Sequence, residues 1–499
     1  MGAIELAFGL IFDPYVLMVM LLAGAFGLFM GAVPGLSATM ATALLVPVTF
    51  FMEPVPALAA IVTATAMAIF AGDLPAALLR IPGTPASAAY TEESYALTRK
   101  GKAELVLGID LTSSIIGGIF GTAVLALGAP VLAEIALNFS SFEYFWLACL
   151  GLTCAAFIAS NQPLKGLASL LIGLLISTIG IDPVSGHPRF TFGIVDLMGG
   201  INFISAMIGM FAVSEVIRRV SDVTPPAHIL QEHIGNIFKG LGSVLWRYKV
   251  NLLRGNVIGT LIGALPGAGA DIAAWISYAM ARRFSKEPEK FGTGHIEGIV
   301  DAGAANNSAL AAAWVPALVF GIPGDSITAI VIGVLYVKGM NPGPTVFLYQ
   351  PELVYAVFLA FFVANLLLLP LGLIAIKSAK QLLRVPQNIL MPIILMFCIV
   401  GTFAINNTVF DIWVMLVLGV VAYFMEENEF PIAPAILGLV LGPLLQETFM
   451  TSMIKAGGDL FAFFDRPIAA GLGVATILVW LSPVLIRLRR HFQTVKART

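Results

Sequence analysis

Charged residues are scarce in this sequence. Asp, Glu, Lys and Arg make up 11% of its 499 residues, whereas 59% are hydrophobic. A soluble domain typically carries about 25% charged residues, so this chain has too few polar groups to cover its surface, and we expect an integral membrane protein. The net charge of −2 offers no basic stripe for nucleic acid. The lipid bilayer is therefore an expected partner and nucleic acid is not.

Cysteine, histidine and the common catalytic motifs are also rare or missing. The three cysteines lie in apolar stretches and predict neither a disulfide framework nor a metal site. The five histidines lack H-E-x-x-H spacing, and neither G-x-x-x-x-G-K-[ST] nor G-x-S-x-G occurs. We therefore expect no enzyme, no metal and no organic cofactor. Because no lysine or arginine precedes the first apolar run, we also expect no cleaved signal peptide.

Long apolar runs occupy most of the chain instead. A spanning helix needs about 20 apolar residues, and the alternation of a membrane β-barrel is absent. The candidate helices lie at 15–33, 36–51, 56–72, 104–128, 143–160, 165–181, 199–217, 252–281, 297–320, 352–376, 388–404, 409–425, 433–449 and 467–487. We expect an all-α polytopic membrane protein with about 10–14 membrane elements, some of them broken or re-entrant, and no strands.

Short motifs recur in the same order in the two halves of the sequence. The pairs are "GAVPG" at 31–35 with "GALPG" at 263–267, "IPG" at 81–83 and 322–324, "KG" at 100–101 and 338–339, and 157–161 with 403–407. Their offsets run from 232 to 246 residues. We infer two transmembrane repeats, at 1–220 and 251–499. An amphipathic cytoplasmic connector at 221–250, with leucines and isoleucines at helical intervals, joins them.

Positive charge predicts opposite orientations for the two repeats. The loop at 50–56 contains no Lys or Arg, whereas the matching loop at 281–290 contains four. Because cytoplasmic loops are enriched in Lys and Arg, the first repeat begins outside and the second inside. Inverted repeats of this kind are typical of secondary transporters, which bind their substrates at broken helices in corresponding positions of the two halves.

Each half contains two Pro-Gly breaks within apolar sequence. Irregular backbone persists at membrane depth only where protein or a water-filled cavity covers it, and helix N-termini attract anions. We expect the backbone N–H groups and hydroxyls there to bind a carboxylate substrate. The predicted substrate residues are Gly35, Ser37, Thr39, Gly83, Thr84, Ser87, Gly267, Gly269, Gly324 and Ser326. Packing kinks are the alternative. Arg80 is either an interfacial anchor or a fork for the carboxylate.

Acidic and amide side chains near the second-half breaks predict an ion site. Such groups are costly in a membrane, and their oxygen atoms suit Na⁺ or H⁺. The predicted ion-coupling residues are Asp271, Asn306, Asn307, Asp325 and Thr328. Polar contact between helices is the alternative for the two asparagines.

At these motifs the sequence resembles a known family. The matching stretches are "GLSATMATALLVPVTF" at 35–50, "LLRIPGTPASAAYTEESYALTRKGKA" at 78–103, "LPGAGADIAAWISYAMARRFSKEPEKFGTGHIEGI" at 265–299 and "VPALVFGIPGDSITAIVIGVL" at 315–335. They resemble the large membrane subunit of the tripartite tricarboxylate transporters (TctA-like), and the similarity runs over essentially the whole chain. One block departs from the family pattern: "DAGAANNSALAAAWVP" at 301–316 is less acidic and less glycine-rich.

The resemblance implies a multi-pass secondary transporter of the bacterial or archaeal inner membrane. Such proteins import citrate, other di- and tricarboxylates or aromatic acids, with Na⁺ or H⁺ as the coupling ion. The implied partners are a TctB-like small membrane subunit and a TctC-like periplasmic solute-binding protein, and a homo-oligomer stays open.

Two other functions compete with an ion-coupled carboxylate carrier. An anion channel would share the helix N-termini but would not need the acidic second half. An intramembrane aspartyl enzyme would use Asp271 and Asp325, although neither stands in a Gly-x-Gly-Asp setting. We favour the carrier, and an elevator rather than a rocking movement, because hairpin-like broken helices can move with the substrate.

Overall fold

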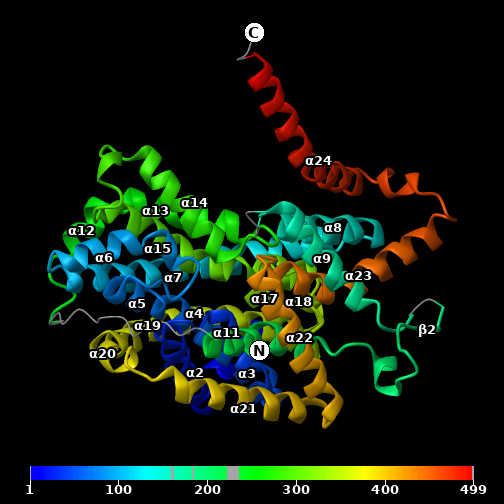
Figure 1. Ribbon diagram of the computed structural model, residues 1–499, viewed down its shortest axis with the longest axis horizontal. Coiled ribbons are helices and arrows are strands. Elements are labelled where there is room, and N and C mark those ends of the chain that lie inside the picture. The colour runs from blue at the N-terminus through cyan, green and yellow to red at the C-terminus, as the bar shows by residue number, and fades with distance from the viewer. Residues whose placement is uncertain (1, 159–161, 183–184, 222–234, 497–499) are drawn as a thin grey trace. The chain divides into compact units, whose positions relative to one another are not determined.

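The chain is helical almost throughout (Figure 1). Its computed structural model describes residues 2–158, 162–182, 185–221 and 235–496. The all-α prediction is confirmed, with one small difference: β1 (Gly180–Ile181) and β2 (Pro188–Arg189) form an antiparallel pair, and β1 takes up the last two residues of the helix predicted at 165–181. Among the described residues, seven helices are long and apolar enough to cross a membrane. The chain is therefore a multi-pass membrane protein.

The helices form two compact units, and each unit takes segments from both halves of the sequence. Unit 1 comprises Met1–Glu134 and Asn202–Phe424, and unit 2 comprises Ile135–Ile201 and Met425–Thr499. The repeats predicted at 1–220 and 251–499 follow a different division of the chain and stay a prediction.

Unit 1 contains two series of helices. The first series is α1 (Ala3–Ile11), α2 (Pro14–Ala32), α3 (Ala38–Phe50), α4 (Pro54–Ala71), α5 (Asp73–Leu79), η1 (Ser87–Ala89), α6 (Thr91–Arg99), α7 (Ala103–Ala136), α10 (Phe203–Met207), the π-helix η3 (Ile208–Val213) and α11 (Ser214–Ser221). The second series is α12 (Leu241–Arg247), α13 (Lys249–Gly263), α14 (Gly269–Phe284), η4 (Pro288–Lys290), α15 (Ile296–Ala312), α16 (Trp314–Phe320), α17 (Ser326–Val337), α18 (Val346–Tyr349), α19 (Pro351–Lys377), α20 (Ala379–Leu382), α21 (Gln387–Asn406) and α22 (Val409–Glu427).

Unit 2 is built around an aromatic cluster. Its helices are α8 (Ser141–Ile158), α9 (Pro163–Ser177), η2 (Val195–Gly199), α23 (Ile432–Lys455), η5 (Phe461–Phe464) and α24 (Pro467–Lys496). Trp146 and Phe463 are buried there, and the Trp146 Nε1–H donates to the Phe463 carbonyl at 2.9 Å. Arg466 Nε donates to the buried Glu143 carboxylate at 2.6 Å, which adds a charged tie to the same cluster.

The α2–α4 pair in the first half of unit 1 packs in the same way as the α13–α15 pair in the second. In each pair, glycines of the first helix lie against the backbone of the second. The contacts are Gly27 with Ala64, Gly31 with Ala68, Gly259 with Ala305 and Gly263 with Ala309. A side chain at any of these glycines would overlap the neighbouring backbone, so the small residues allow the close approach.

α4 and α15 both end in a kink and continue as a short helix. Pro75 and Pro316 have no N–H to bond the carbonyl four residues earlier. Those carbonyls belong to Ala71 and Ala312, the last residues of α4 and α15. A single helix is predicted over 297–320, and the structure divides it at the proline for this reason.

The predicted connector at 221–250 lies partly outside the described residues, because 222–234 are not described. In the part that is described, Ile237 and Leu241 are buried in the main hydrophobic cluster of unit 1. The end of the connector is therefore anchored to this unit before α13 begins.

Candidate functional site

The first Pro-Gly break lies between α2 and α3. α3 begins after Ser37, whose hydroxyl accepts a hydrogen bond from the Met40 N–H at 3.0 Å. Gly35 has a φ of 92°, a conformation that favours glycine. The 13 residues of α3 give about 20 Å of helix, which is too short to cross a hydrocarbon core of about 30 Å.

An arginine that the sequence analysis did not assign to the site lies against this break. A Cβ atom on Gly35 would overlap the guanidinium of Arg219 in α11. Arg219 Nε donates to Glu215 Oε1 at 2.7 Å. The π-helix η3 comes directly before α11 and packs on α3, so it helps to set the direction in which α11 approaches. No local pattern marks Arg219, because it meets Gly35 only through helix packing.

In the second break of the first half, between α5 and α6, the polar groups form hydrogen bonds with one another. The Thr84 N–H donates to Ser87 Oγ at 3.0 Å, and the Ser87 N–H donates to Thr84 Oγ1 at 3.1 Å. The Gly83 N–H, a predicted substrate donor, donates to the Gly72 carbonyl at 3.1 Å. A Cβ atom on Gly83 would be 3.0 Å from the Gly31 carbonyl oxygen. The two breaks of the first half therefore adjoin.

The matching break between α16 and α17 has the same hydrogen bonds, offset by 241 residues. The Asp325 N–H donates to Thr328 Oγ1 at 2.8 Å, and the Thr328 N–H donates to Asp325 Oδ1 at 2.8 Å. This reciprocal pair is a capping box, so Asp325 and Thr328, both predicted for the ion, also start α17. Gly324 lies against Ala313, as Gly83 lies against Gly72.

The break between α13 and α14 touches the α16–α17 break. Gly267 and Gly269 have φ values of 78° and 63°. A Cβ atom on Gly269 would be 2.6 Å from Asp325 Cβ. The two breaks of the second half are thus also in contact.

α14 joins the breaks of the two halves. Asp271, in its first turn, is exposed and interacts with the Ala86 backbone. One turn later, the Trp275 Nε1–H donates to the Pro85 carbonyl at 3.2 Å. α3 packs in turn on α17. α14 thus contacts the second break of the first half, α3 contacts the helix that follows the second break of the second half, and all four breaks form one continuous region of unit 1. Thr39 and Ser326 lie half-buried in the first turns of α3 and α17.

Arg80 is engaged by a carboxylate of the protein itself. Its Nε donates to Glu92 Oε1 at 3.0 Å and its Nη2 to Glu92 Oε2 at 2.9 Å. Both side chains are exposed, and the hydrogen bonds and charge of Glu92 raise the pKa of Arg80 above its ordinary value. The guanidinium is thus held at the surface beside α6.

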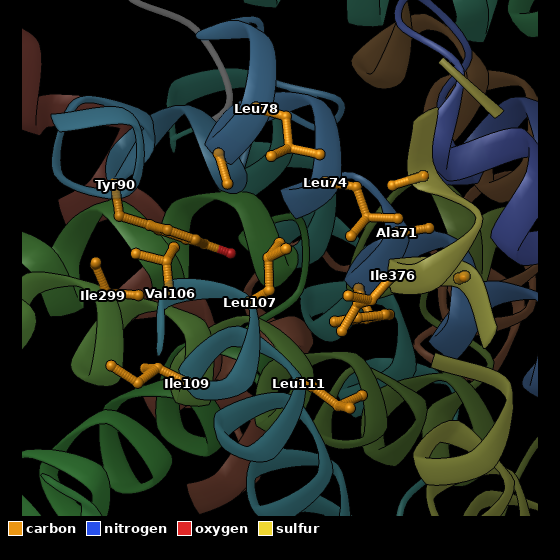
Figure 2. Packing of buried hydrophobic residues seen from close by; sticks show 14 of the residues in the cluster. Ala71, Leu74, Leu78, Tyr90, Val106, Leu107, Ile109, Leu111, Ile299 and Ile376 are labelled. Atoms are coloured by element: carbon orange, nitrogen blue, oxygen red, sulfur yellow. The ribbon is translucent and has the colours of Figure 1, made fainter. Parts of the chain in front are cut away.

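A buried polar group in unit 1 contains residues that the sequence analysis missed. Tyr90 Oη donates to Asp73 Oδ1 at 2.6 Å, inside the hydrophobic cluster of Figure 2. Asp110 of α7 is fully buried, and Asn306 and Asn307 of α15 are 1% and 2% exposed. The signal available in the sequence was an acidic residue within each of two first-half apolar runs, which marks a functional position in a membrane protein.

Comparisons with known proteins agree with the membrane fold. A sequence profile described as the tripartite tricarboxylate transporter TctA family matches residues 17–437. An uncharacterized 52.8 kDa protein in the TAR-I ttuC' 3' region of Agrobacterium vitis is 35% identical over 460 residues, which cover 92% of this chain and 91% of that protein. An uncharacterized protein in the TAR-II ttuC' 3' region of the same organism is 37% identical over 228 residues, which cover 45% of this chain and 94% of that protein. No solved structure matches.

Proposed function

The chain belongs to the tripartite tricarboxylate transporter TctA family, and from this premise we propose that it imports carboxylates by ion-coupled secondary transport. It acts as the large membrane subunit of a binding-protein-dependent system in the inner membrane. Its partners are a TctB-like small membrane subunit and a TctC-like periplasmic solute-binding protein. The substrate is citrate, another di- or tricarboxylate, or an aromatic acid, and Na⁺ or H⁺ is the coupling ion.

The observation that carries this proposal is the gathering of four broken helices from both halves of the chain. Gly31 adjoins Gly83, Asp271 interacts with Ala86, and Gly269 adjoins Asp325. Broken helices at corresponding positions of two repeats are where secondary transporters bind substrate and ion. The start of α3 offers backbone N–H groups to an anion, and Arg219 adds a guanidinium that suits a carboxylate.

Two lysines at matching positions support the inverted orientation of the repeats. Lys100 Nζ donates to the Thr293 carbonyl at 2.6 Å, before α15, and Lys338 Nζ donates to the Phe50 carbonyl at 2.7 Å, at the end of α3. Each half thus holds the corresponding loop of the other, as a pseudo-two-fold axis would produce. The loop that Lys100 contacts includes residues 281–290 and is rich in Lys and Arg, whereas the loop that Lys338 contacts, at 50–56, has neither. This difference fits positions on opposite sides of the membrane.

The test is counterflow of radiolabelled citrate and other carboxylates in proteoliposomes that contain the chain and both partner proteins. We expect accumulation that saturates with substrate and depends on a Na⁺ or H⁺ gradient. A saturable, gradient-driven flux separates a carrier from an anion channel. Absence of uptake under every gradient and with every carboxylate of the panel would refute the proposal.

The breaks can be tested with Gly35→Leu and Gly267→Leu. Both place a bulky side chain at a positive φ, where carboxylate oxygens are to approach the backbone, so we expect at least about a tenfold loss of uptake. Gly457→Leu is the matched control, because Gly457 has a φ of 60° and open space around it. The amount of monodisperse protein in the membrane shows whether folding persists. Normal uptake by both site variants would contradict the proposed site.

A further inference from the structure

Two carboxylates lie inside unit 1 without a positive side chain beside them. Asp73 begins α5, directly after the kink at Gly72, and Asp110 lies within α7. Their exposed fractions are 1% and 0%. Among the described residues, no Lys, Arg or His forms an ion pair with either, and the two carboxylates are close enough to repel each other.

Several oxygen atoms in this group have no hydrogen-bond partner. Tyr90 occupies one Asp73 oxygen, but the other one and both oxygens of Asp110 are buried and unpaired. Asn306 Oδ1 and Ser113 Oγ are also buried and unpaired. Asp73 belongs to α5, Tyr90 directly precedes α6, Asp110 and Ser113 belong to α7, and Asn306 belongs to α15. The group therefore exists only in the folded chain.

Neighbouring contacts bring these side chains to one place. The Asn306 side chain interacts with the Tyr90 hydroxyl, and the charges of Asp73 and Asp110 both act on Tyr90. Ser113 lies one turn after Asp110, and its Cβ would be 3.6 Å from a Cβ atom on Gly303, one turn before Asn306. We name this set, Asp73, Tyr90, Asp110, Ser113 and Asn306, the acidic core.

Apolar side chains surround the acidic core. Figure 2 shows Val106 and Leu107 of α7 and Ile299 of α15 near Tyr90, with Ile109 further away. A buried carboxylate without a partner costs several kcal/mol, and buried polar atoms in native proteins are almost always paired. Several unpaired oxygen atoms at one place therefore call for a small positively charged ligand.

We propose that the acidic core is the Na⁺ site that couples ion entry to carboxylate import. A proton shared by the two carboxylates would leave Asn306 Oδ1 and Ser113 Oγ unpaired, whereas Na⁺ accepts carboxylate, amide and hydroxyl oxygens together. This inference rests on the proposed function for its role in coupling, but not for ion binding.

The acidic core is connected to two of the four breaks through the backbone. Asp73 follows Gly72, whose carbonyl accepts the Gly83 N–H at 3.1 Å. Asn306 lies on α15, which ends where Gly324 packs on Ala313. Na⁺ bound between α5, α7 and α15 would therefore hold both kinks in one arrangement and raise the affinity of the breaks for the anion. By linkage, the carboxylate would raise the affinity for Na⁺ equally.

The test measures Na⁺ binding on the purified chain alone, in detergent, without substrate or partner proteins. NaCl is exchanged for choline chloride at constant ionic strength and pH, and the melting temperature is recorded. Because a ligand that binds the native state stabilises it, we expect the melting temperature to rise with Na⁺. Asp73→Asn and Asp110→Asn should each weaken the apparent affinity for Na⁺ at least about tenfold. Asp411→Asn, in a buried carboxylate of α22 that is paired with Asn406, should leave it unchanged.

If an aspartate variant fails to fold, Ser113→Ala and Asn306→Ala keep both carboxylates and are expected to weaken Na⁺ binding as well. If the melting temperature of every core variant depends on Na⁺ in the same way as that of the unmodified protein, the proposed site is wrong. A melting temperature that responds to pH but not to Na⁺ would also overturn it, in favour of a proton. If the core variants abolish Na⁺ binding, the site is supported even when no carboxylate is transported. If the protein takes up carboxylate but does not bind Na⁺, the Na⁺ site is refuted and the proposed transport function is not.

Discussion

At the scale of single residues, Glu93 is a buried carboxylate that the protein stabilises with its own hydrogen-bond donors. Its side chain is fully buried. It accepts the Tyr278 hydroxyl at 2.8 Å and the N–H groups of Gly294 and His295 at 2.7 Å each. Every one of these donors lies on the second half of the chain, so Glu93 fastens α6 to the segment before α15. The contrast with the unpaired oxygens of Asp110 is what makes the acidic core unusual.

We expect Glu93→Ala to lower the stability by about 2–4 kcal/mol, because it leaves several buried donors without an acceptor. Thermal unfolding of the purified protein measures the change. Glu92→Ala is the control from the adjacent position, since the ion pair of Glu92 with Arg80 is exposed, and exposed pairs contribute about 0–1 kcal/mol. Similar melting temperatures for the two variants would show that the Glu93 contacts are not formed.

At the scale of elements, glycine contacts set the distance between the central helices. Gly27 lies against the α4 backbone, where a Cβ atom would be 2.8 Å from Ala64 Cα. α4 is buried on all sides from Val55 to Ala71, so it has no room to move away. The corresponding α13–α15 pair of the second half obeys the same constraint. The short distance between the paired helices in both halves is therefore possible only because glycine has no Cβ atom at these contacts.

Gly27→Ala should destabilise the protein by about 1–3 kcal/mol, because overpacking outweighs the gain in helix propensity. Gly128→Ala is the matched control on α7: Gly128 has open space around it, and alanine there should stabilise the helix by about 0.5–1 kcal/mol. Melting temperatures in detergent report both changes. Opposite signs are expected, and a neutral or stabilising Gly27→Ala would mean that α2 and α4 do not touch through their backbones.

At the scale of the whole molecule, the two lysine contacts make the orientation of the halves testable. Lys100 and Lys338 end matching helices and hold matching loops of the opposite half. In an inverted pair of repeats, these two positions must lie on opposite sides of the bilayer. In a parallel pair they would lie on the same side.

Single cysteines at Lys100→Cys and Lys338→Cys, in a background without the three native cysteines, report this arrangement. We expect a membrane-impermeant maleimide to label position 338 in intact cells and position 100 only in inverted vesicles, because the Lys- and Arg-rich loop that Lys100 contacts is predicted to be cytoplasmic. Labelling of both cysteines from one side would contradict the inverted repeat. Retained uptake by the variants shows that the labelled protein is native.

The sequence by itself determined the membrane class and the positions of the breaks. Hydrophobicity and the chemistry of proline and glycine act locally, so the break between α13 and α14 and the matching one between α2 and α3 could be predicted from their residues. The recurrence of the motifs identified corresponding positions, and the hydrogen bonds of Thr84 and Ser87 reappear at Asp325 and Thr328.

Only the tertiary structure decided which groups meet. Arg219 contacts Gly35, and Tyr90 interacts with both Asp73 and Asp110. Both arrangements arise from the packing of helices that are far apart in the chain. The same packing engages the Gly83 N–H, which local reasoning assigned to the substrate. A pattern of residue types specifies where a helix stops, but the partner of a buried polar atom depends on which helix face comes to lie beside it, and that is a property of the assembled fold.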